Sequence, residues 1–338
     1  MLAHKPHGID EVALDAYLRQ RLPDLKGQVH IESVAGGQSN PTFFVSYDNH
    51  KLVLRKKPVG ALPSAHAVDR EYRVMTALRE TDLPVPETLF YCGDESVLGT
   101  AFYVMRRLEG RVFSDSTLPG VKPSDRQAIY MEMADILAKL HAVDFSRAGL
   151  ADFGKAGNYF ERQVARWTKQ WQLSKERDLA SIDYLVEWLP AHIPAEDETT
   201  IAHGDFRLGN LMFHPDEPKV IGVLDWELST LGHPLADVAY SALTWHLGST
   251  EYMGIRDLDF RALGIPEEGT YLERYSRASG RRETVKPFHF AFSLFRLAVI
   301  FEGIAARARL GNASSENAAE VGKLTSTLAQ RAVEEITC

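Results

Sequence analysis

The sequence predicts an α+β fold with two lobes, a small antiparallel β lobe followed by a larger, mainly α-helical lobe. Three observations support this prediction. Before about residue 106, short runs of alternating apolar and polar residues are separated by turns rich in Gly, Pro and Asn. After residue 110, long segments carry apolar residues three and four positions apart, as helices with one buried face do. The chain has 338 residues, 45% of them apolar, which is enough to bury a large core.

The first lobe is expected to contain a leading helix, five strands and a second helix. The leading helix is predicted at residues 11–21, where apolar positions recur before the helix breaker Pro23. The other elements are predicted as strands at 30–35, 42–47 and 51–56, a helix at 67–79, and strands at 87–91 and 101–107. We place this lobe at residues 1–106, a hinge at 107–110 and the second lobe at 111–338.

A glycine-rich turn follows the first predicted strand and reads Gly36-Gly37-Gln38-Ser39-Asn40. Two glycines let a backbone approach an anion closely, and the exposed N–H groups together with Ser39 can bind phosphate oxygens. A purely structural turn is the alternative, and this motif alone is weak. We predict a phosphate loop made by Gly36, Gly37, Ser39 and Asn40.

The second lobe is predicted to be mostly helical, with helices at 125–141, 159–172, 182–189 and 288–308. His141 ends the first of these apolar stripes and is expected to be a packed, hydrogen-bonded histidine. The last helical region carries Arg296, Arg307 and Arg309. Structural ion pairing is the expected role of these arginines, and a grip on an anionic substrate is the alternative.

The most informative stretch is His-Gly-Asp-Phe-Arg-Leu-Gly-Asn at residues 203–210, followed by a predicted hairpin and then Asp225-Trp-Glu. Asn210 begins one hairpin strand and Asp225 follows the other, so antiparallel pairing would bring the two together. Amide and carboxylate oxygens are ligands that Mg²⁺ prefers. Asp205 lies in the loop before them. A carboxylate that takes the proton of an acceptor hydroxyl, beside a metal site of this kind, is what phosphoryl transfer from a metal-bound nucleotide requires.

Composition excludes several other classes of protein. The formal net charge is -8 and the pI is near 5.9, which argues against a nucleic-acid partner. Two cysteines make no disulfide framework, and residues 1–10 lack the apolar core of a signal peptide. The apolar stretch 288–304 carries His289, Arg296 and Glu302 and reads as a buried helix, not a membrane span. We expect a cytoplasmic protein without a membrane partner; the sequence makes no prediction of its oligomeric state.

These motifs resemble the aminoglycoside phosphotransferase family of small-molecule kinases. The resemblance runs from Gly36 to about Asn312 and rests on Gly-Gly-Gln-Ser-Asn-Pro-Thr, on His-Gly-Asp-Phe-Arg-Leu-Gly-Asn and on Leu-Asp-Trp-Glu-Leu-Ser-Thr-Leu-Gly-His-Pro-Leu-Ala-Asp-Val. It is nearest to the branch that also forms the kinase-like N-terminal part of certain acyl-CoA dehydrogenases. The resemblance implies a protein-kinase-like bilobal fold, ATP as the phosphoryl donor (GTP is not excluded) and Mg²⁺ as the metal.

The resemblance also implies roles in the first lobe. Arg55, at the end of the third strand, falls where such kinases place the cation that binds the nucleotide phosphates. Lys56 is the alternative, although it points to the opposite face of a regular strand. For either residue, a solvated charge without a binding role is the other interpretation. Glu71 lies on the apolar face of the next helix and needs a partner. That partner is either Arg55, as in kinases, or an arginine of its own helix, Arg70 or Arg79; we favour Arg55.

In the second lobe and the hinge, the resemblance implies further roles. Arg207 would neutralise the transferred phosphate, and Asp237 would bond the backbone of the catalytic loop. Met105 and the hinge after it would pair with the edge of the adenine. His203 is expected to be structural. Glu227 is either a further metal contact or a satisfied acid.

The acceptor implied by the resemblance is a small hydroxylated metabolite, and in the branch named above a hydroxyacyl-CoA. An aminoglycoside, choline or sugar kinase is the alternative within the family. The alternative from another class is a nucleotide-binding pseudokinase or regulatory module. The intact set of Asp205, Asn210 and Asp225 favours an enzyme.

Overall fold

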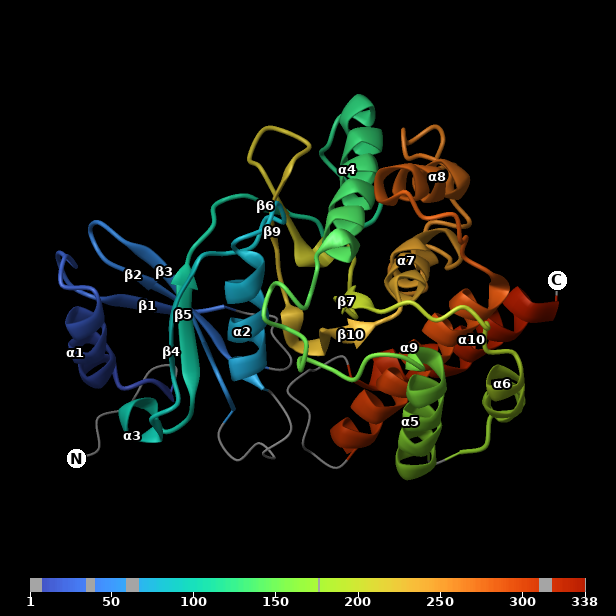
Figure 1. Ribbon diagram of the computed structural model, residues 1–338, viewed down its shortest axis with the longest axis horizontal. Coiled ribbons are helices and arrows are strands. Elements are labelled where there is room, and N and C mark those ends of the chain that lie inside the picture. The colour runs from blue at the N-terminus through green and yellow to red at the C-terminus, as the bar shows by residue number, and fades with distance from the viewer. Residues whose placement is uncertain (1–7, 35–39, 59–66, 176, 310–317, 338) are drawn as a thin grey trace. The chain divides into compact units, whose positions relative to one another are not determined.

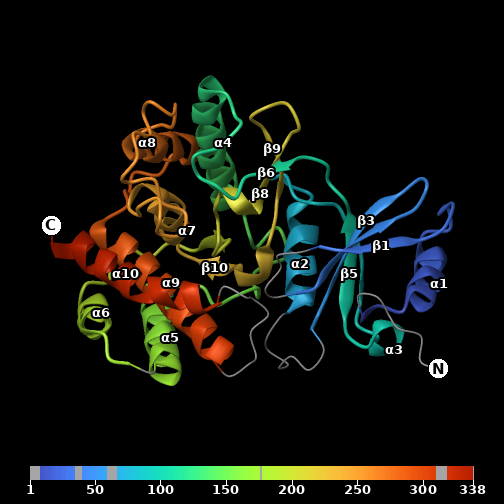
Figure 2. The same ribbon diagram turned by 180° about the vertical axis from the view of Figure 1, so that it is seen from behind.

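Two units with separate cores make up the chain (Figures 1 and 2). The structure, a computed structural model, describes residues 8–34, 40–58, 67–175, 177–309 and 318–337. The first unit comprises Met1–Glu109 and Gly222–Glu227, and the second comprises Gly110–Ile221 and Leu228–Cys338. Residues 222–227 therefore join the first unit, whereas the sequence had placed them in the second lobe. A hydrogen bond joins this segment to the first unit, because the Val223 N–H donates to the Pro84 carbonyl at 2.8 Å.

A five-stranded antiparallel sheet with strand order β1-β2-β3-β5-β4 is the centre of the first unit. Its strands are β1 (His30–Ser33), β2 (Thr42–Ser46), β3 (Lys51–Lys56), β4 (Thr88–Cys92) and β5 (Phe102–Arg106). Figure 1 shows α1 (Glu11–Arg21) and α2 (Val68–Leu78) on opposite faces of this sheet. A short helix, α3 (Glu95–Leu98), adds to the α1 side.

Alternation along β3 decides which side chains reach each face. Leu52 and Leu54 join the apolar core under α1, together with Leu14 and Leu18 of that helix. Lys56 points to the same face of β3 as these two leucines, and its Nζ donates to the Leu98 carbonyl of α3 at 2.9 Å. Successive strand residues point to opposite faces, so the residues between them in β3 face α2.

The second unit is mainly helical. Its helices are α4 (Pro123–Ala142), α5 (Tyr159–Ser174), α6 (Ala180–Ala191), α7 (Pro234–Ala242), α8 (Glu268–Ser279), α9 (Pro287–Arg309) and α10 (Ala318–Thr337). Helix α9 packs against α5, α6, α7 and α10 and so forms the centre of the unit. Its stretch Pro287–Ala306 is apolar and long enough to cross a membrane, but 89% of that stretch is buried. It is a core helix, as the sequence predicts.

Short strands after residue 110 carry the polar motifs. Strand β7 (Thr200–Ala202) pairs with β10 (Thr230–Gly232), and β6 (Arg111–Val112), β8 (Leu211–Phe213) and β9 (Val220–Val223) form a three-stranded sheet. The predicted hairpin is present, since β8 and β9 are neighbours and the His214 N–H donates to the Lys219 carbonyl at 2.8 Å. The motif at 203–210 runs between β7 and β8.

Candidate active site

A glycine shapes the loop that carries the candidate base. Gly204 follows the last residues of β7 and has φ +83°, a conformation that side chains with a Cβ rarely adopt. A Cβ at this position would also lie 2.7 Å from the Leu228 carbonyl oxygen. Both constraints require glycine before Asp205, which explains the His-Gly-Asp reading of the motif.

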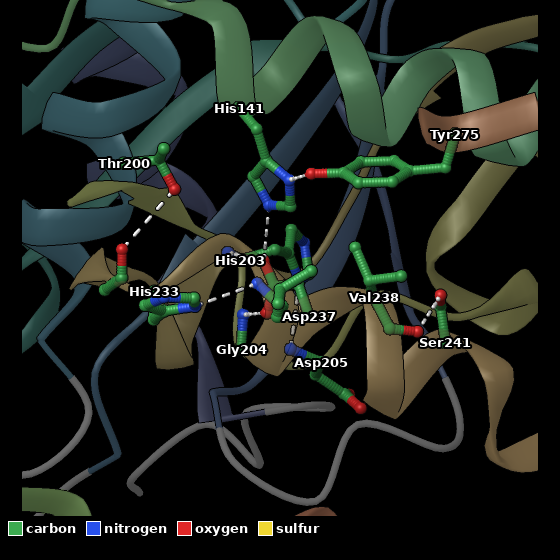
Figure 3. Close-up of polar contacts among 12 residues, drawn as sticks. His141, Thr200, His203, Gly204, Asp205, His233, Asp237, Val238, Ser241 and Tyr275 are labelled. Atoms are coloured by element: carbon green, nitrogen blue, oxygen red, sulfur yellow. Dashed lines mark hydrogen bonds and ion pairs between the residues drawn. The ribbon is translucent and has the colours of Figure 1, made fainter. Parts of the chain in front are cut away.

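Asp237 fixes the backbone of this loop (Figure 3). It lies in the first turn of α7, a helix that starts with His233 as its cap and Pro234 at its first position. Its Oδ2 accepts the His203 N–H at 2.6 Å and its Oδ1 accepts the Gly204 N–H at 2.9 Å. The sequence prediction for Asp237 is therefore confirmed.

His141 supports Asp237 from α4. Its Nε2 lies 3.5 Å from Oδ2 of Asp237, and its Nδ1 lies 2.7 Å from the Tyr275 hydroxyl (Figure 3). Burial opposes the ionisation of Asp237, but the bond from His141, the charges of His141 and His203 and the bond from the Gly204 N–H together outweigh it, and the pKa of Asp237 falls below its usual range. Burial lowers the pKa of His141 itself. Both groups are buried, so His141 is the structural histidine that the sequence predicts.

Arg296 of α9 holds the same loop from the other direction. Its Nη2 donates to the Gly204 carbonyl at 2.6 Å, and its guanidinium lies 5.7 Å from the ring of Trp167 and 5.9 Å from that of Tyr240. The side chain is only 7% exposed. These contacts support the structural role expected for Arg296, and the alternative that Arg296 grips a substrate anion stays a prediction. The side chains of Arg307 and Arg309 lie outside the described residues.

Both carboxylate oxygens of Asp205 are held. Oδ1 accepts the Tyr240 hydroxyl at 2.5 Å, and Oδ2 accepts Nδ2 of Asn210 at 2.7 Å. The same Nδ2 donates to the Asp205 carbonyl at 2.8 Å. Nε of Arg207 lies 3.4 Å from Oδ1. The Asp205 side chain nevertheless stays 19% exposed, so a small molecule can reach it.

Asn210 is oriented by these contacts in a way that suits a metal ligand. Its amide nitrogen faces two acceptors on Asp205, which leaves the amide oxygen as the end available to a further partner. Asn210 itself lies in the short 3₁₀ turn Leu208–Asn210, directly before β8. An oxygen donor of this kind fits a hard divalent cation.

Tyr240 is a site residue that sequence reasoning missed. It lies on α7 three positions after Asp237, so the two side chains share one side of the helix. Burial, reinforced by the charge of Asp205, raises the pKa of Tyr240 well above its usual value. The hydroxyl therefore stays protonated and donates. Its place one turn after Asp237 is the sequence signal that could have identified it.

Arg55 of β3 is the centre of a second polar cluster, in the first unit. Its Nη1 lies 3.1 Å from Glu71, and its Nη2 lies 2.8 Å from Asp225 and 3.7 Å from Glu227. The predicted Arg55–Glu71 pair is thus present, and Arg79 instead pairs with Glu87. Three carboxylates thus lie within 4 Å of one guanidinium, whose positive charge they balance.

Two further side chains hold Glu71 in place. The Tyr103 hydroxyl donates to Oε2 at 3.0 Å, and Nδ2 of Asn40 donates to Oε1 at 2.6 Å. Tyr103 stands opposite Arg55 in the pairing of β3 with β5, which places both side chains on one face. Burial raises the pKa of Glu71 to about 7, although the charge of Arg55 opposes this rise.

Asn40, the last residue of the predicted phosphate loop, is fully buried, and its Nδ2 donates to Glu71. Its side chain therefore positions Glu71, and a contact of Asn40 with phosphate stays a prediction. Gly36, Gly37 and Ser39 lie outside the described residues.

Asp225 has a strained backbone. Its φ is +63°, which is uncommon for a residue other than glycine. Such strain clusters at functional positions, where surrounding contacts enforce it. Here the Trp226 indole N–H donates to the Val223 carbonyl at 2.9 Å and the Arg55 pair holds the carboxylate. Among the described residues, no group of three or more His, Cys, Asp or Glu forms a metal site alone, so a metal would need nucleotide or water oxygens as well.

Met105 and the hinge after it are predicted to pair with the edge of the adenine. Met105 lies within β5, opposite Val53 and Thr88. The next two backbone N–H groups, of Arg106 and Arg107, donate to the carbonyls of Glu87 and Lys51 at 2.8 and 3.0 Å. Both donors thus have partners in the first unit, and the pairing of Met105 and the hinge with adenine stays a prediction.

Comparison with known proteins decides the family. The profile of APH, described as the phosphotransferase enzyme family, matches residues 30–283. The chain belongs to this family. Among solved structures, a protein from Ralstonia eutropha provisionally assigned as an aminoglycoside phosphotransferase is 47% identical, with a TM-score of 0.88 over 97% of this chain and 98% of the other.

More distant members of the APH family confirm the kinase-like α+β fold. Aminoglycoside phosphotransferase APH(4)-Ia is 14% identical, with a TM-score of 0.62 over 94% of this chain and 98% of the other. Aminoglycoside 2'-phosphotransferase-IIIa is 13% identical, with a TM-score of 0.65 over 95% of this chain and 99% of the other. At these identities the likeness shows the fold alone.

The curated relatives of this APH-family chain are longer proteins. Mouse acyl-CoA dehydrogenase family member 10 is 44% identical over 97% of this chain, and human acyl-CoA dehydrogenase family member 11 is 40% identical over 96%. The chain spans 31% of the first and 43% of the second.

Proposed function

We propose that this phosphotransferase moves the terminal phosphoryl group of ATP to a hydroxyl group of a small metabolite. The observation that carries the proposal is the Asp205 carboxylate, fixed by Tyr240 and Asn210 on a rigid loop and still open to solvent. A positioned carboxylate can orient a hydroxyl and take its proton as the phosphoryl group arrives. Structures of fold relatives contain ADP, AMP-PNP or GDP, which supports a nucleotide donor and keeps GTP as an alternative to ATP.

The remaining polar residues have roles that fit this reaction. Asn210 would give an amide oxygen and Asp225 a carboxylate oxygen to Mg²⁺. A bound Mg²⁺ would neutralise charge on the nucleotide phosphates. Arg55, kept in place by Glu71, would bind a phosphate oxygen, and Arg207 would face the transferred group. Gly36, Gly37 and Ser39 would cradle the phosphates with their backbone.

For the acceptor, a hydroxyacyl-CoA is the compound class we propose first. It is supported by the acyl-CoA dehydrogenase names of relatives that are 40–44% identical over nearly the whole chain. An aminoglycoside is the second candidate, supported by the provisional assignment of the Ralstonia eutropha protein.

A screen of ATP consumption tests the proposal. Purified protein is offered hydroxyacids, hydroxyacyl-CoAs, choline, sugars and kanamycin-type aminoglycosides, and each product is identified by mass. Phosphorylation of a hydroxyacyl-CoA and none of kanamycin is the expected result. Efficient phosphorylation of kanamycin alone would show that the acceptor is an aminoglycoside, with the proposed phosphoryl transfer unchanged. Nucleotide binding without transfer to any acceptor class would favour a pseudokinase.

A further inference from the structure

Two exposed apolar side chains flank the catalytic loop. Leu228 is 38% exposed and Tyr252 is 39% exposed, and both belong to the second unit. The Leu228 backbone borders Gly204, whose missing Cβ would touch it. The Arg207 guanidinium lies 5.9 Å from the centre of the Tyr252 ring, and its Nε lies 3.4 Å from Oδ1 of Asp205. Large apolar side chains left open beside a reactive carboxylate suggest that a ligand covers them.

Tyr252 is presented by a strained backbone. Its φ is +55°, in the left-handed region. Bulky side chains are genuine outliers there, and strain of this kind persists only where surrounding contacts enforce it. A sequence under no functional demand would favour Gly or Asn at such a position.

The residues on either side of Tyr252 supply those contacts. The Glu251 carboxylate accepts two bonds from Arg331 of α10, at 3.0 and 2.8 Å, and one from the Gly248 N–H at 2.8 Å. The Met253 carbonyl accepts the Ser116 hydroxyl at 2.8 Å. The Tyr252 and Phe301 rings pack edge to face, with their centres 5.2 Å apart. The loop is thus held rigidly, with the ring beside the catalytic loop.

We propose that Tyr252 and Leu228 are specificity-determining residues that form an apolar rim of the acceptor site. The acceptor then carries an apolar segment next to the hydroxyl that receives the phosphoryl group. Asp205 sets the position of that hydroxyl, and covering both side chains with acceptor carbon removes apolar surface from water. A densely hydroxylated polycation would leave them uncovered and would meet the positive charge of Arg207. This inference rests on the proposed phosphotransferase function.

Kinetics with matched acceptors test the rim. The variants Tyr252→Ala and Leu228→Ala are compared with wild type, using ATP with a long-chain and a short-chain hydroxyacyl-CoA. We expect kcat/KM for the long-chain acceptor to fall by about tenfold or more, with a smaller fall for the short one and an unchanged KM for ATP. Tyr184→Ala, which removes a tyrosine of α6 that is 43% exposed, is the matched control and should behave as wild type.

A second variant separates recognition from folding. Asn tolerates a left-handed backbone, so Tyr252→Asn should keep or raise the melting temperature while acceptor kcat/KM falls. A lower melting temperature together with wild-type acceptor kinetics would make Tyr252 purely structural and overturn the inference, as would equal losses for both chain lengths. If wild type phosphorylates no hydroxylated acceptor, the proposed function fails and this inference with it. An active wild type with unaffected variants refutes the rim alone.

Discussion

Asp205 shows at the scale of one residue how this fold prepares a carboxylate for chemistry. Its two oxygens are held by different kinds of donor, a phenolic hydroxyl at 2.5 Å and an amide at 2.7 Å. Hydrogen bonds from a hydroxyl to a carboxylate are short and strong, so they fix the rotamer of the acid. The loop behind it is fixed as well, by Asp237 and Arg296. A base that is already in place loses little entropy when the acceptor arrives.

Removing the Tyr240 hydroxyl should therefore slow transfer without changing nucleotide binding. We expect Tyr240→Phe to lower kcat by roughly tenfold, since Asp205 loses one of two restraints, with the KM for ATP unchanged. Steady-state kinetics with the acceptor found in the screen measure both quantities. Tyr271→Phe is the control, because that buried hydroxyl is bonded to Ser241 and not to Asp205. An equal loss of kcat in the two variants would mean that Tyr240 acts only through packing.

At the scale of the elements, hydrophobic periodicity predicted the helices and strands that their own local sequence determines. Helix α1 and strand β3 coincide with the predicted ranges, because their apolar spacing is complete within the element. Helices α8 and α10 were not predicted; α8 buries Tyr271 and Tyr275 but is otherwise largely polar. The contacts of Glu71 likewise include one that local sequence could predict and one that it could not. Its charge and its apolar face predicted a partner, and the resemblance to kinases favoured Arg55 as that partner, whereas the bond from Asn40 crosses 31 residues and has no local signal.

His246 joins elements that lie far apart in the sequence, and it should make stability depend on pH. Its ring is bonded to Glu268 of α8 at 2.9 Å and to Glu335 of α10 at 2.8 Å. Burial alone would lower its pKa, but the two carboxylates raise the pKa to about 9, above the value of 6.5 for an unpaired histidine.

Because the folded pKa is the higher one, this stabilisation is complete below pH 6.5 and is lost as the pH rises through about 9. We expect His246→Gln to lower the unfolding free energy by roughly 1–3 kcal/mol below pH 6.5 and by much less above pH 9. Urea unfolding of both proteins at the two ends of this range is the measurement. A difference that does not change with pH would show that the ring acts by packing alone.

At the scale of the whole molecule, the chain returns to its first unit at residues 222–227 and brings Asp225 to Arg55. The cation expected to bind phosphate and a carboxylate expected to bind metal thus belong to one cluster, although they lie 170 residues apart in the sequence. This pairing could not be read from the sequence, which assigned the two residues to different lobes. The metal role proposed for Asp225 would therefore affect nucleotide binding directly.

We expect Asp225→Ala to weaken binding of ATP with Mg²⁺ far more than binding of ATP with a chelator. Isothermal titration calorimetry under both conditions measures the difference. Asp216→Ala is the matched control, since Asp216 is an exposed aspartate in the turn of the same hairpin. Equal losses with and without Mg²⁺ would contradict a metal-ligand role and leave Asp225 as a partner of Arg55 only.

The central claim is that Asp205 acts as the base in transfer of a phosphoryl group to a hydroxyl. The most direct test measures acceptor phosphorylation by Asp205→Asn, a substitution of nearly equal shape, together with its affinity for ATP. The account predicts a fall in kcat of about 10² to 10⁴, with ATP affinity kept. Turnover close to wild type would contradict the claim.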